Sequence, residues 1–320
     1  MNEPELSVVL VSRNERSHID DCLDSVFDAC RGVGTFEVVL VDSNSSDGTV
    51  ERASDYPISI LQIPRDDLCT PGAGRYVGTR VARGEYLLFV DGDMTVAGGW
   101  ISEALRFLRV SSGVAGVTGH LNRRTVDEVD EVDALRGVAL FRADALEEVG
   151  SYDPYLESSE DVDLCFRLAD AGYSLVRLPV VAARHPERDG FGEPLRRWRN
   201  GYFHGVGQAV RKAVRSPRVL VRYGYTLRYP LLTAGWIGLG AAALALGAPT
   251  AVGWAIGSVF AFAVPALRNG PQNTAVFAAS FLLTLLGLGA GLLREPRAPD
   301  DFPVDAVAVK QVHGDVHEGA

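Results

Sequence analysis

Lysine is nearly absent from this chain of 320 residues: only two of its 31 basic residues, Lys212 and Lys310, are lysines. Acidic residues outnumber basic ones, and the formal net charge is −10. Such a composition is typical of proteins that work in concentrated salt, where charge preserves solubility and salt screens self-repulsion. We therefore expect a halophilic source. The alternative is a GC-rich genome that favours arginine codons.

Cysteine is also scarce. The four cysteines, Cys22, Cys30, Cys69 and Cys165, form no C-x-x-C pair. The apolar run over 6–11 is too short for a signal peptide. We expect the N-terminal part to lie in a reducing cytosol.

Acidic residues are missing altogether between residues 205 and 293. Within this region three apolar runs, 229–247, 249–267 and 274–293, each have about 20 residues, the length that crosses a bilayer. A soluble helix of this length would carry a polar face. The sequence therefore predicts two or three transmembrane helices, and we prefer three.

Basic residues gather just before these apolar runs. By the positive-inside rule, this flank and the N-terminal domain lie in the cytoplasm. The interleaved apolar side chains suit a segment on anionic headgroups. Three helices would place the C-terminal tail outside, whereas Arg294 and Arg297 favour the inside. The six basic residues are Arg211, Lys212, Arg215, Arg218, Arg222 and Arg228.

Buried strands alternate with amphipathic helices in the first 204 residues. This alternation predicts an α/β fold with a mostly parallel sheet and helices on both faces. Ligands of such sheets bind beyond the carboxyl ends of the strands. Polar residues follow the strands there, so we expect the chemistry at this edge. The predicted strands include 6–11, 36–43, 58–63 and 85–93.

Two aspartates, Asp91 and Asp93, end an apolar strand. Side chains two apart in an extended chain point the same way, and Gly92 leaves room between them. Converging carboxylates suit a hard divalent cation such as Mg²⁺ or Mn²⁺, which often bridges to phosphate. The alternative is an Asp-Gly-Asp surface turn.

Two further acidic stretches follow predicted buried segments. Asp42 ends a strand and could accept hydrogen bonds from a base or ribose; the alternative is a capping loop without a ligand. Asp161, assisted by Glu160, could act as a general base at a helix start. A capping box of Ser158 with Asp161 is the alternative there.

Taken together, these stretches resemble family 2 glycosyltransferases of the GT-A fold. The resemblance covers about residues 5–200 and implies a nucleotide-sugar donor of the UDP or GDP type and a Mn²⁺ or Mg²⁺ cofactor. It further implies transfer of a hexosyl group with inversion. The matching stretches are "SVVLVSRNE" (7–15), "VDSNSSDGT" (41–49), "GAGRYVGTRVARGEYLLFVDGD" (72–93) and "GVALFRADALEEVGSYDPYLESSEDVDLCFRLADAGY" (137–173).

The resemblance also implies roles for single residues. Asp161 matches the general base, and Arg75 would lie near the donor. Asp91 would approach the ribose or the metal, while Asp93, with His185 as a further ligand, would hold the metal on the diphosphate. The nucleoside pocket would be lined by Asn14, Glu15 and Asp42.

The sequence departs from the family pattern at two places. The segment "RRW" (196–198) lacks the preceding glutamine of processive members, so Arg197 and Trp198 either contact the acceptor or anchor the domain at the membrane interface. Val11 and Arg13 replace the usual proline and aromatic residue, which leaves the identity of the nucleotide's base open.

A dinucleotide fingerprint is excluded, because the glycine spacing of "GAGRYVG" (72–78) is wrong.

The expected protein is multi-pass in the cell membrane, with a cytoplasmic catalytic domain. We expect that domain over 1–204, a basic interfacial segment over 205–228, transmembrane helices over 229–293 and an acidic, flexible tail over 294–320. The favoured function extends a dolichyl- or polyprenyl-linked glycan, for N-glycosylation or a surface polysaccharide. The alternatives are transfer to bare lipid phosphate and a catalytically silent membrane scaffold. Nucleic acid is not an expected partner.

Overall fold

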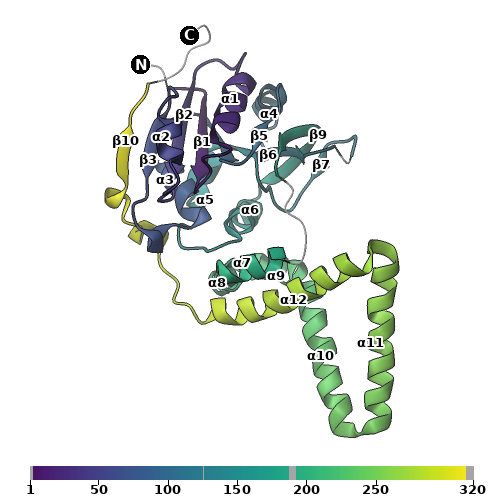
Figure 1. Cartoon of the computed structure of the whole chain (residues 1–320). Helices are drawn as coiled ribbons and strands as arrows, with labels where there is room; N and C mark the ends of the chain where they lie inside the picture. The colour runs from purple at the N-terminus through teal and green to yellow at the C-terminus, as the bar shows by residue number, and fades with distance from the viewer. Residues whose placement is uncertain (1–2, 125, 187–191, 315–320) are drawn as a thin grey trace. The chain divides into compact units, whose positions relative to one another are not determined.

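The computed structural model describes residues 3–124, 126–186 and 192–314, which form two compact units (Figure 1). The first unit combines residues 1–186 with 297–320, and the second comprises 187–296. The boundary at Pro186 precedes the predicted one at 204, because the short basic helices that begin at Gly192 belong to the second unit.

Parallel strands form the first half of the sheet in the first unit. β1 lies between β2 and β4, with Leu6 opposite both Phe36 and Tyr86. This arrangement confirms the predicted parallel core. The strands are β1 (Leu6–Ser12), β2 (Phe36–Asp42), β3 (Ser59–Gln62) and β4 (Tyr86–Asp91).

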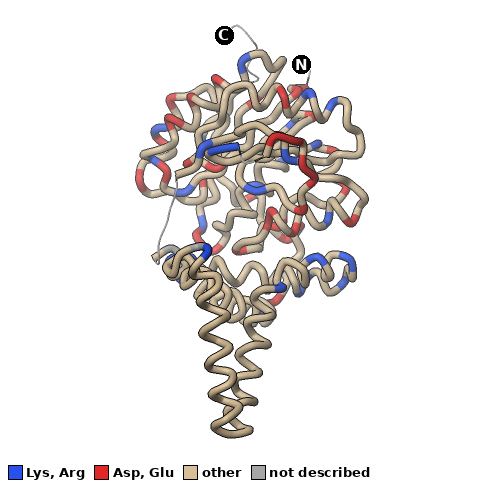
Figure 2. Tube along the Cα trace, turned by 90° about the vertical axis from the view of Figure 1, so that its right-hand side faces the viewer, with Lys and Arg blue, Asp and Glu red and all other residues tan. Residues whose placement is uncertain are grey.

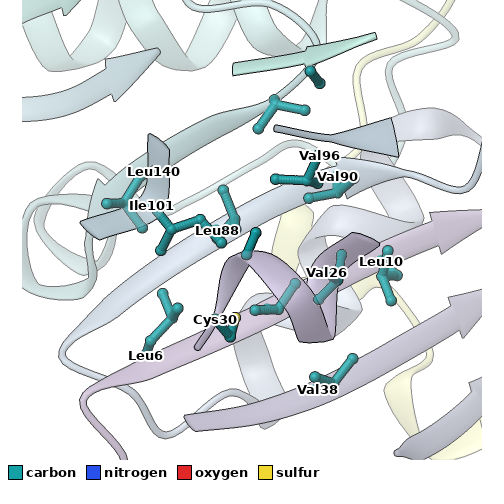
Figure 3. Packing of buried hydrophobic residues seen from close by; sticks show 14 of the residues in the cluster. Leu6, Leu10, Val26, Cys30, Val38, Leu88, Val90, Val96, Ile101 and Leu140 are labelled. Atoms are coloured by element: carbon teal, nitrogen blue, oxygen red, sulfur yellow. The ribbon is translucent and has the colours of Figure 1, made fainter. Parts of the chain in front are cut away.

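Two clusters of buried side chains cover the two faces of this sheet. Leu6 and Leu10 face one cluster, drawn in Figure 3, whereas Val9 faces the other. Successive strand residues point to opposite faces, so a strand that is apolar throughout is buried on both sides. The helices around these strands are α1 (Ile19–Ala29), α2 (Thr49–Ala53), α3 (Pro71–Val81) and α4 (Trp100–Val110), with a 3₁₀ turn, η1 (Asp66–Leu68).

The second half of the sheet is mixed rather than parallel. β8 is antiparallel to both β4 and β6, while β9 is parallel to β6 and antiparallel to β5 and β7. The elements are β5 (Thr95–Val96), β6 (Val114–Leu121), β7 (Asp130–Glu131), β8 (Ala139–Arg142), β9 (Ser174–Arg184), α5 (Ala143–Val149) and α6 (Glu160–Asp170).

The C-terminal segment returns to the first unit. After η2 (Pro299–Asp301) and η3 (Val304–Ala306), β10 (Ala308–Gln311) pairs antiparallel with the edge strand β3. The ring of Phe302 is buried, 5.8 Å from that of Tyr76. The expectation of a flexible tail is therefore wrong for residues 299–311.

Helices make up the second unit. Three of them are long and apolar enough to cross a membrane, which agrees with the three apolar runs of the sequence. In Figure 2, the hairpin formed by two of them carries hardly any charged residue. The helices are α7 (Gly192–Arg199), α8 (His204–Ala213), α9 (Pro217–Thr226), α10 (Arg228–Leu246), α11 (Ala248–Asn269) and α12 (Pro271–Leu292).

Candidate active site

The polar ends of β1, β2 and β4 meet at one edge of the sheet. Ser12 lies opposite Asp42, and Val11 lies opposite Asp91, so the loops after all three strands start at one level. The parallel pairing thus brings the predicted nucleoside-pocket residues and the first aspartate of "DGD" (91–93) to the same edge.

The loop after β2 is organised by Asp42. Its side chain is fully buried and accepts hydrogen bonds from Ser45 N at 2.8 Å and Gln62 Nε2 at 3.0 Å. The hydroxyls of Ser12 and Ser45 donate to it as well. Asp42 therefore organises this loop, and its contact with a base or ribose stays a prediction.

Asn14 and Glu15 join the loop after β1 to the loop after β2. Asn14 adopts φ = 57°, and its Oδ1 accepts a hydrogen bond from Ser46 N at 2.9 Å. The backbone N–H of Glu15 donates to the Thr49 hydroxyl at 2.9 Å. Asn14 is exposed and Glu15 is half-buried, so both lie within reach of a ligand at this edge.

Sequence reasoning missed one polar group beside this loop pair. Asp66 in η1 accepts hydrogen bonds from Arg13 Nη2 at 2.9 Å and from Asn44 Nδ2 at 3.2 Å. Arg13 was noted only as a departure from the family pattern. The exposed "RDD" segment (65–67) directly after β3 was the signal that could have indicated it.

Arg75 holds three carboxylates together in the interior. Its Nη2 lies 2.7 Å from Asp91 Oδ1, its Nη1 3.3 Å from Glu160 Oε1 and its Nε 3.6 Å from Asp161 Oδ1. The guanidinium is almost completely buried and also stands over the Tyr152 ring at 5.8 Å. These four charged residues form what we call the Arg75 cluster. The sequence predicted Arg75 near the donor but not this set of partners.

Glycines allow α3 to carry Arg75 into this position. A Cβ at Gly72 would overlap the backbone oxygen of Asp153, and one at Gly78 would overlap the side chain of Val9. The helix starts at Thr70, whose hydroxyl accepts a hydrogen bond from Ala73 N, and Pro71 occupies its first turn. The glycines of "GAGRYVG" therefore serve close packing of α3.

Burial changes the acidity of the Arg75 cluster. The pKa of Asp161 is raised to about 7: burial is the largest cause, the charges of Glu160 and Asp91 act in the same direction, and Arg75 opposes them. Burial also raises the pKa of Glu160, again opposed by Arg75. A carboxylate with a pKa near neutrality suits a general base.

The start of α6 is not the predicted capping box. The N-cap residue is Ser159, with φ = 63°, and it makes no side-chain capping hydrogen bond. Glu160 and Asp161 occupy the first turn and contact Arg75. The helix cap thus differs from the alternative that has Ser158 as its cap, and the role of Asp161 as a general base stays a prediction.

Asp93 and His185 lie together at the end of β9. The antiparallel pairing of Thr95 with Arg184 brings their loops side by side, and His185 Nε2 lies 3.5 Å from Asp93 Oδ2. Asp91 thus forms an ion pair with Arg75, whereas Asp93 lies beside His185. Asp91 is one-third exposed and keeps access to a ligand.

A divalent ion fits the pair of Asp93 and His185. Among the residues that the structure describes, no group of three or more His, Cys, Asp and Glu side chains forms a metal cage. Mg²⁺ is usually held by one or two carboxylates together with substrate phosphates. Asp93 would supply a carboxylate of that mode, His185 would be an additional nitrogen ligand, and the diphosphate of a bound donor would complete the coordination.

Comparison with known proteins identifies the family that the N-terminal domain resembles. Residues 7–148 match the model of "Glycosyl transferase family 2". Over these residues the chain is similar to glycosyltransferase family 2. Sugar transfer from a nucleotide-sugar donor is therefore its class of activity.

Curated glycosyltransferases are similar over most of the chain. Glycosyltransferase AglE from Haloferax volcanii is 29% identical over 216 residues, which cover 61% of this chain and 70% of that protein. The pre-mycofactocin glycosyltransferase of Mycobacterium tuberculosis is 26% identical over 269 residues, 74% of this chain and 54% of that protein.

Solved structures confirm the GT-A fold. Mannosyltransferase PcManGT from Pyrobaculum calidifontis, in complex with GDP-Man and Mn²⁺, has a TM-score of 0.67 at 21% identity and covers 92% of this chain and 88% of its own. S. aureus TarS 1–349 in complex with UDP has a TM-score of 0.52 at 17% identity, over 89% and 90% of the two chains.

Arg197 and Trp198 lie in the second unit, apart in the chain from the glycosyltransferase domain. The Trp198 ring lies 5.7 Å from that of His204, and the Arg197 guanidinium lies over the Tyr202 ring at 5.0 Å. Both contacts are internal to the second unit. Anchoring at the membrane interface and contact with an acceptor both stay predictions.

Proposed function

We propose that the protein transfers a hexosyl group, with inversion, from a UDP- or GDP-sugar to a lipid-linked acceptor in the membrane. The observation that carries the proposal is the Arg75 cluster, which supplies a carboxylate with a pKa near 7 beside the end of β4 in a family 2 domain. Bound GDP-Man in PcManGT and UDP in TarS support both nucleotide types.

Asp161 is the general base of this proposal. It takes the proton from the acceptor hydroxyl while that oxygen attacks the anomeric carbon and the nucleoside diphosphate leaves from the opposite face, which inverts the configuration. Arg75 fixes Asp161 relative to Asp91. Glu160 assists through the same guanidinium.

Asp93 and His185 would hold Mn²⁺ or Mg²⁺ on the diphosphate, with Asp91 facing the ribose or the ion. The ion supplies Lewis-acid stabilisation of the negative charge on the leaving group. Asn14 and Glu15, together with the loop that Asp42 organises, would line the nucleoside pocket. This division of roles separates donor binding at the sheet edge from proton removal at α6.

The apolar helices of the second unit argue for a lipid acceptor. Basic residues precede α10 without any acid among them, so the catalytic domain would face the cytoplasm. A glycan on a dolichyl or polyprenyl carrier is the favoured acceptor, and bare polyprenyl phosphate is the second candidate. Both keep their reactive group at the membrane surface.

Transfer from UDP- and GDP-sugars to extracted membrane lipids tests this proposal. We expect Asp161→Asn in the full-length protein to lower kcat by about 10²–10⁴-fold, the typical contribution of a general base, while nucleotide binding persists. Glu147→Gln, an exposed acid on α5, is the matched control and should leave kcat unchanged. Full activity of Asp161→Asn would refute the assigned base, whereas an unsubstituted protein that transfers no sugar from either donor type would revive the scaffold alternative.

The acceptor is tested in the same assay. Lipid-linked oligosaccharide and bare polyprenyl phosphate are supplied separately with each donor. Product formed on the oligosaccharide supports the favoured acceptor. Product formed only on bare polyprenyl phosphate replaces it with the second candidate.

A further inference from the structure

The C-terminal segment is anchored to the glycosyltransferase domain by several independent contacts. Val309 pairs with Leu61 in the antiparallel β10–β3 ladder. Gln311 Nε2 donates to the backbone oxygens of Tyr56 and Ile58 at 2.9 and 3.0 Å. Residues 297–311 therefore lie on the same side of a membrane as the catalytic domain.

The link between α12 and this anchored segment is short. α12 ends at Leu292, and the Arg297 guanidinium already lies over the Tyr155 ring of the first unit at 5.3 Å. Five residue steps of extended chain span at most about 18 Å. The hydrocarbon core of a bilayer is about 30 Å thick. The C-terminal end of α12 must therefore lie on the catalytic side.

The N-terminal end of α10 lies on that side too. The described helices before it, α7, α8 and α9, have at most 10 residues each. A helix of 10 residues is about 15 Å long and cannot cross a bilayer. The start of α10 and the end of α12 therefore lie on the same side of the membrane. The segment between them, α10 to α12, must cross the membrane an even number of times.

We propose that α10 and α11 cross the membrane as a hairpin and that α12 lies in the membrane surface on the catalytic side. α10 and α11 are joined by a turn at Gly247 without a charged residue. Trp236 Nε1 donates to Ser258 Oγ at 3.0 Å, and Trp254 Nε1 donates to the Trp236 oxygen at 3.0 Å. These contacts tie the two helices together within the apolar layer.

α12 packs against α8 rather than extending the hairpin. In Figure 1 it runs across one end of the hairpin, beside α7 and α8. A Cβ at Gly287 would overlap the Phe203 backbone oxygen, and one at Gly291 would overlap that of His204, so the two backbones touch. Arg211 Nη1 donates to the backbone oxygens of Leu292 and Arg294, both at 2.8 Å.

These contacts set the depth of α12. α8 carries the charged side chains of Arg211 and Lys212, which belong among lipid headgroups rather than in hydrocarbon. A helix in backbone contact with α8 lies at the same level. Exposed apolar side chains of α12, including Phe277, Leu282 and Leu286, would then face the boundary between headgroups and acyl chains.

The distribution of positive charge supports the same topology independently. With two crossings, Arg268 at the end of α11, Arg294 after α12 and the basic residues before α10 all lie on one side. With three crossings, Arg294 and Arg297 would lie opposite the other basic residues, against the positive-inside rule. Mean hydropathy by itself would predict that α12 spans the membrane, because its value of 2.1 is the highest of the three helices. The contacts and the charge distribution argue against that prediction.

Cysteine labelling of the full-length protein in sealed membrane vesicles tests the topology. Val110→Cys marks the catalytic domain, Leu246→Cys the turn between α10 and α11, and Val312→Cys the C-terminal segment; all three positions are exposed. We expect an impermeant maleimide to label Val110→Cys and Val312→Cys in one vesicle orientation and Leu246→Cys in the other. The unsubstituted chain gives the background from the native cysteines.

Two results would overturn the proposal. Labelling of Val312→Cys from the side of Leu246→Cys would demonstrate three crossings, and labelling of all three from one side would demonstrate none. Spin labels at Phe277→Cys and Leu286→Cys then measure the depth of α12. A surface helix gives equal, shallow depths, whereas a spanning helix separates the two labels by about 13 Å along its axis and contradicts the proposal.

Discussion

Arg75 connects the proposed donor edge of the site to the proposed general base, Asp161. One buried cation serves Asp91 from β4 and both Glu160 and Asp161 from α6. Removing a charge from water is costly, so burial raises the pKa of Glu160 and of Asp161, and the guanidinium opposes that rise. Lysine cannot reproduce the fork of donors that serves several acceptors at once.

Replacement of Arg75 should change the pH dependence of catalysis. Asp161 must be deprotonated to act as a base, so activity should fall as the pH drops below about 7. Arg75 lowers this pKa, and an ammonium group cannot contact all three carboxylates, so Arg75→Lys should move the acid limb of kcat/KM to higher pH. Activity at pH 7 should then fall several-fold. The pH–rate profiles of the two proteins provide the measurement.

The control for this experiment lies on the same helix. Arg80 of α3 is half-exposed and contacts Tyr76 and Asp300 instead of the Arg75 cluster. Arg80→Lys should leave the acid limb in place. An acid limb that is unmoved in Arg75→Lys as well would mean that Arg75 does not tune Asp161.

At the scale of elements, glycine spacing decides how closely helices approach their neighbours. α12 has three glycines in its last turns, of which Gly287 and Gly291 touch α8, whereas a Cβ at Gly289 would meet open space. Contacts of this kind let helix backbones approach closely where apolar burial contributes little. Gly291, which touches a neighbouring backbone, and Gly289, which does not, therefore provide a matched pair of positions for substitution.

Gly291→Leu should destabilise the second unit, and Gly289→Leu should not. A side chain at 291 forces α12 away from the His204 backbone, and overpacking of this kind typically costs about 1–3 kcal/mol. Thermal unfolding of the purified protein in detergent provides the comparison. Equal midpoints for the two variants would show that α8 and α12 do not pack as described.

Charge is the property of the whole molecule that bears on its environment. Residues 1–204 carry 35 acidic against 21 basic residues, and several acids face solvent. Their repulsion extends over about 10 Å at 0.1 M salt and about 3 Å at 1 M. A chain adapted to concentrated salt should be less stable in dilute buffer.

The thermal midpoint should therefore rise between 0.1 M and 1 M KCl, two concentrations chosen to span that change in screening. Circular dichroism or intrinsic tryptophan fluorescence can follow unfolding. Sucrose at equal osmolality controls for effects that do not involve charge. A thermal midpoint that is the same at both salt concentrations would favour the alternative, in which a GC-rich genome favours arginine codons over lysine codons.

The sequence by itself determined the order of strands and helices in the parallel half, the catalytic edge and the apolar character of the C-terminal region. These features follow from local patterns: apolar strands, polar residues after them, and runs of about 20 apolar residues. Asp91, Asp93 and Asp161 were predicted as site residues in this way, whereas Arg75 and His185 were predicted from the resemblance to family 2 glycosyltransferases.

Only the tertiary structure decided which of these residues act together. Arg75 meets Glu160 across 85 positions, His185 meets Asp93 through the pairing of β5 with β9, and β10 returns to β3 from the far end of the chain. No local spacing encodes such contacts, because they depend on how distant segments pack. The same holds for α12: its composition matches a membrane span, whereas the anchoring of the residues after it argues that it returns to the side from which the chain came.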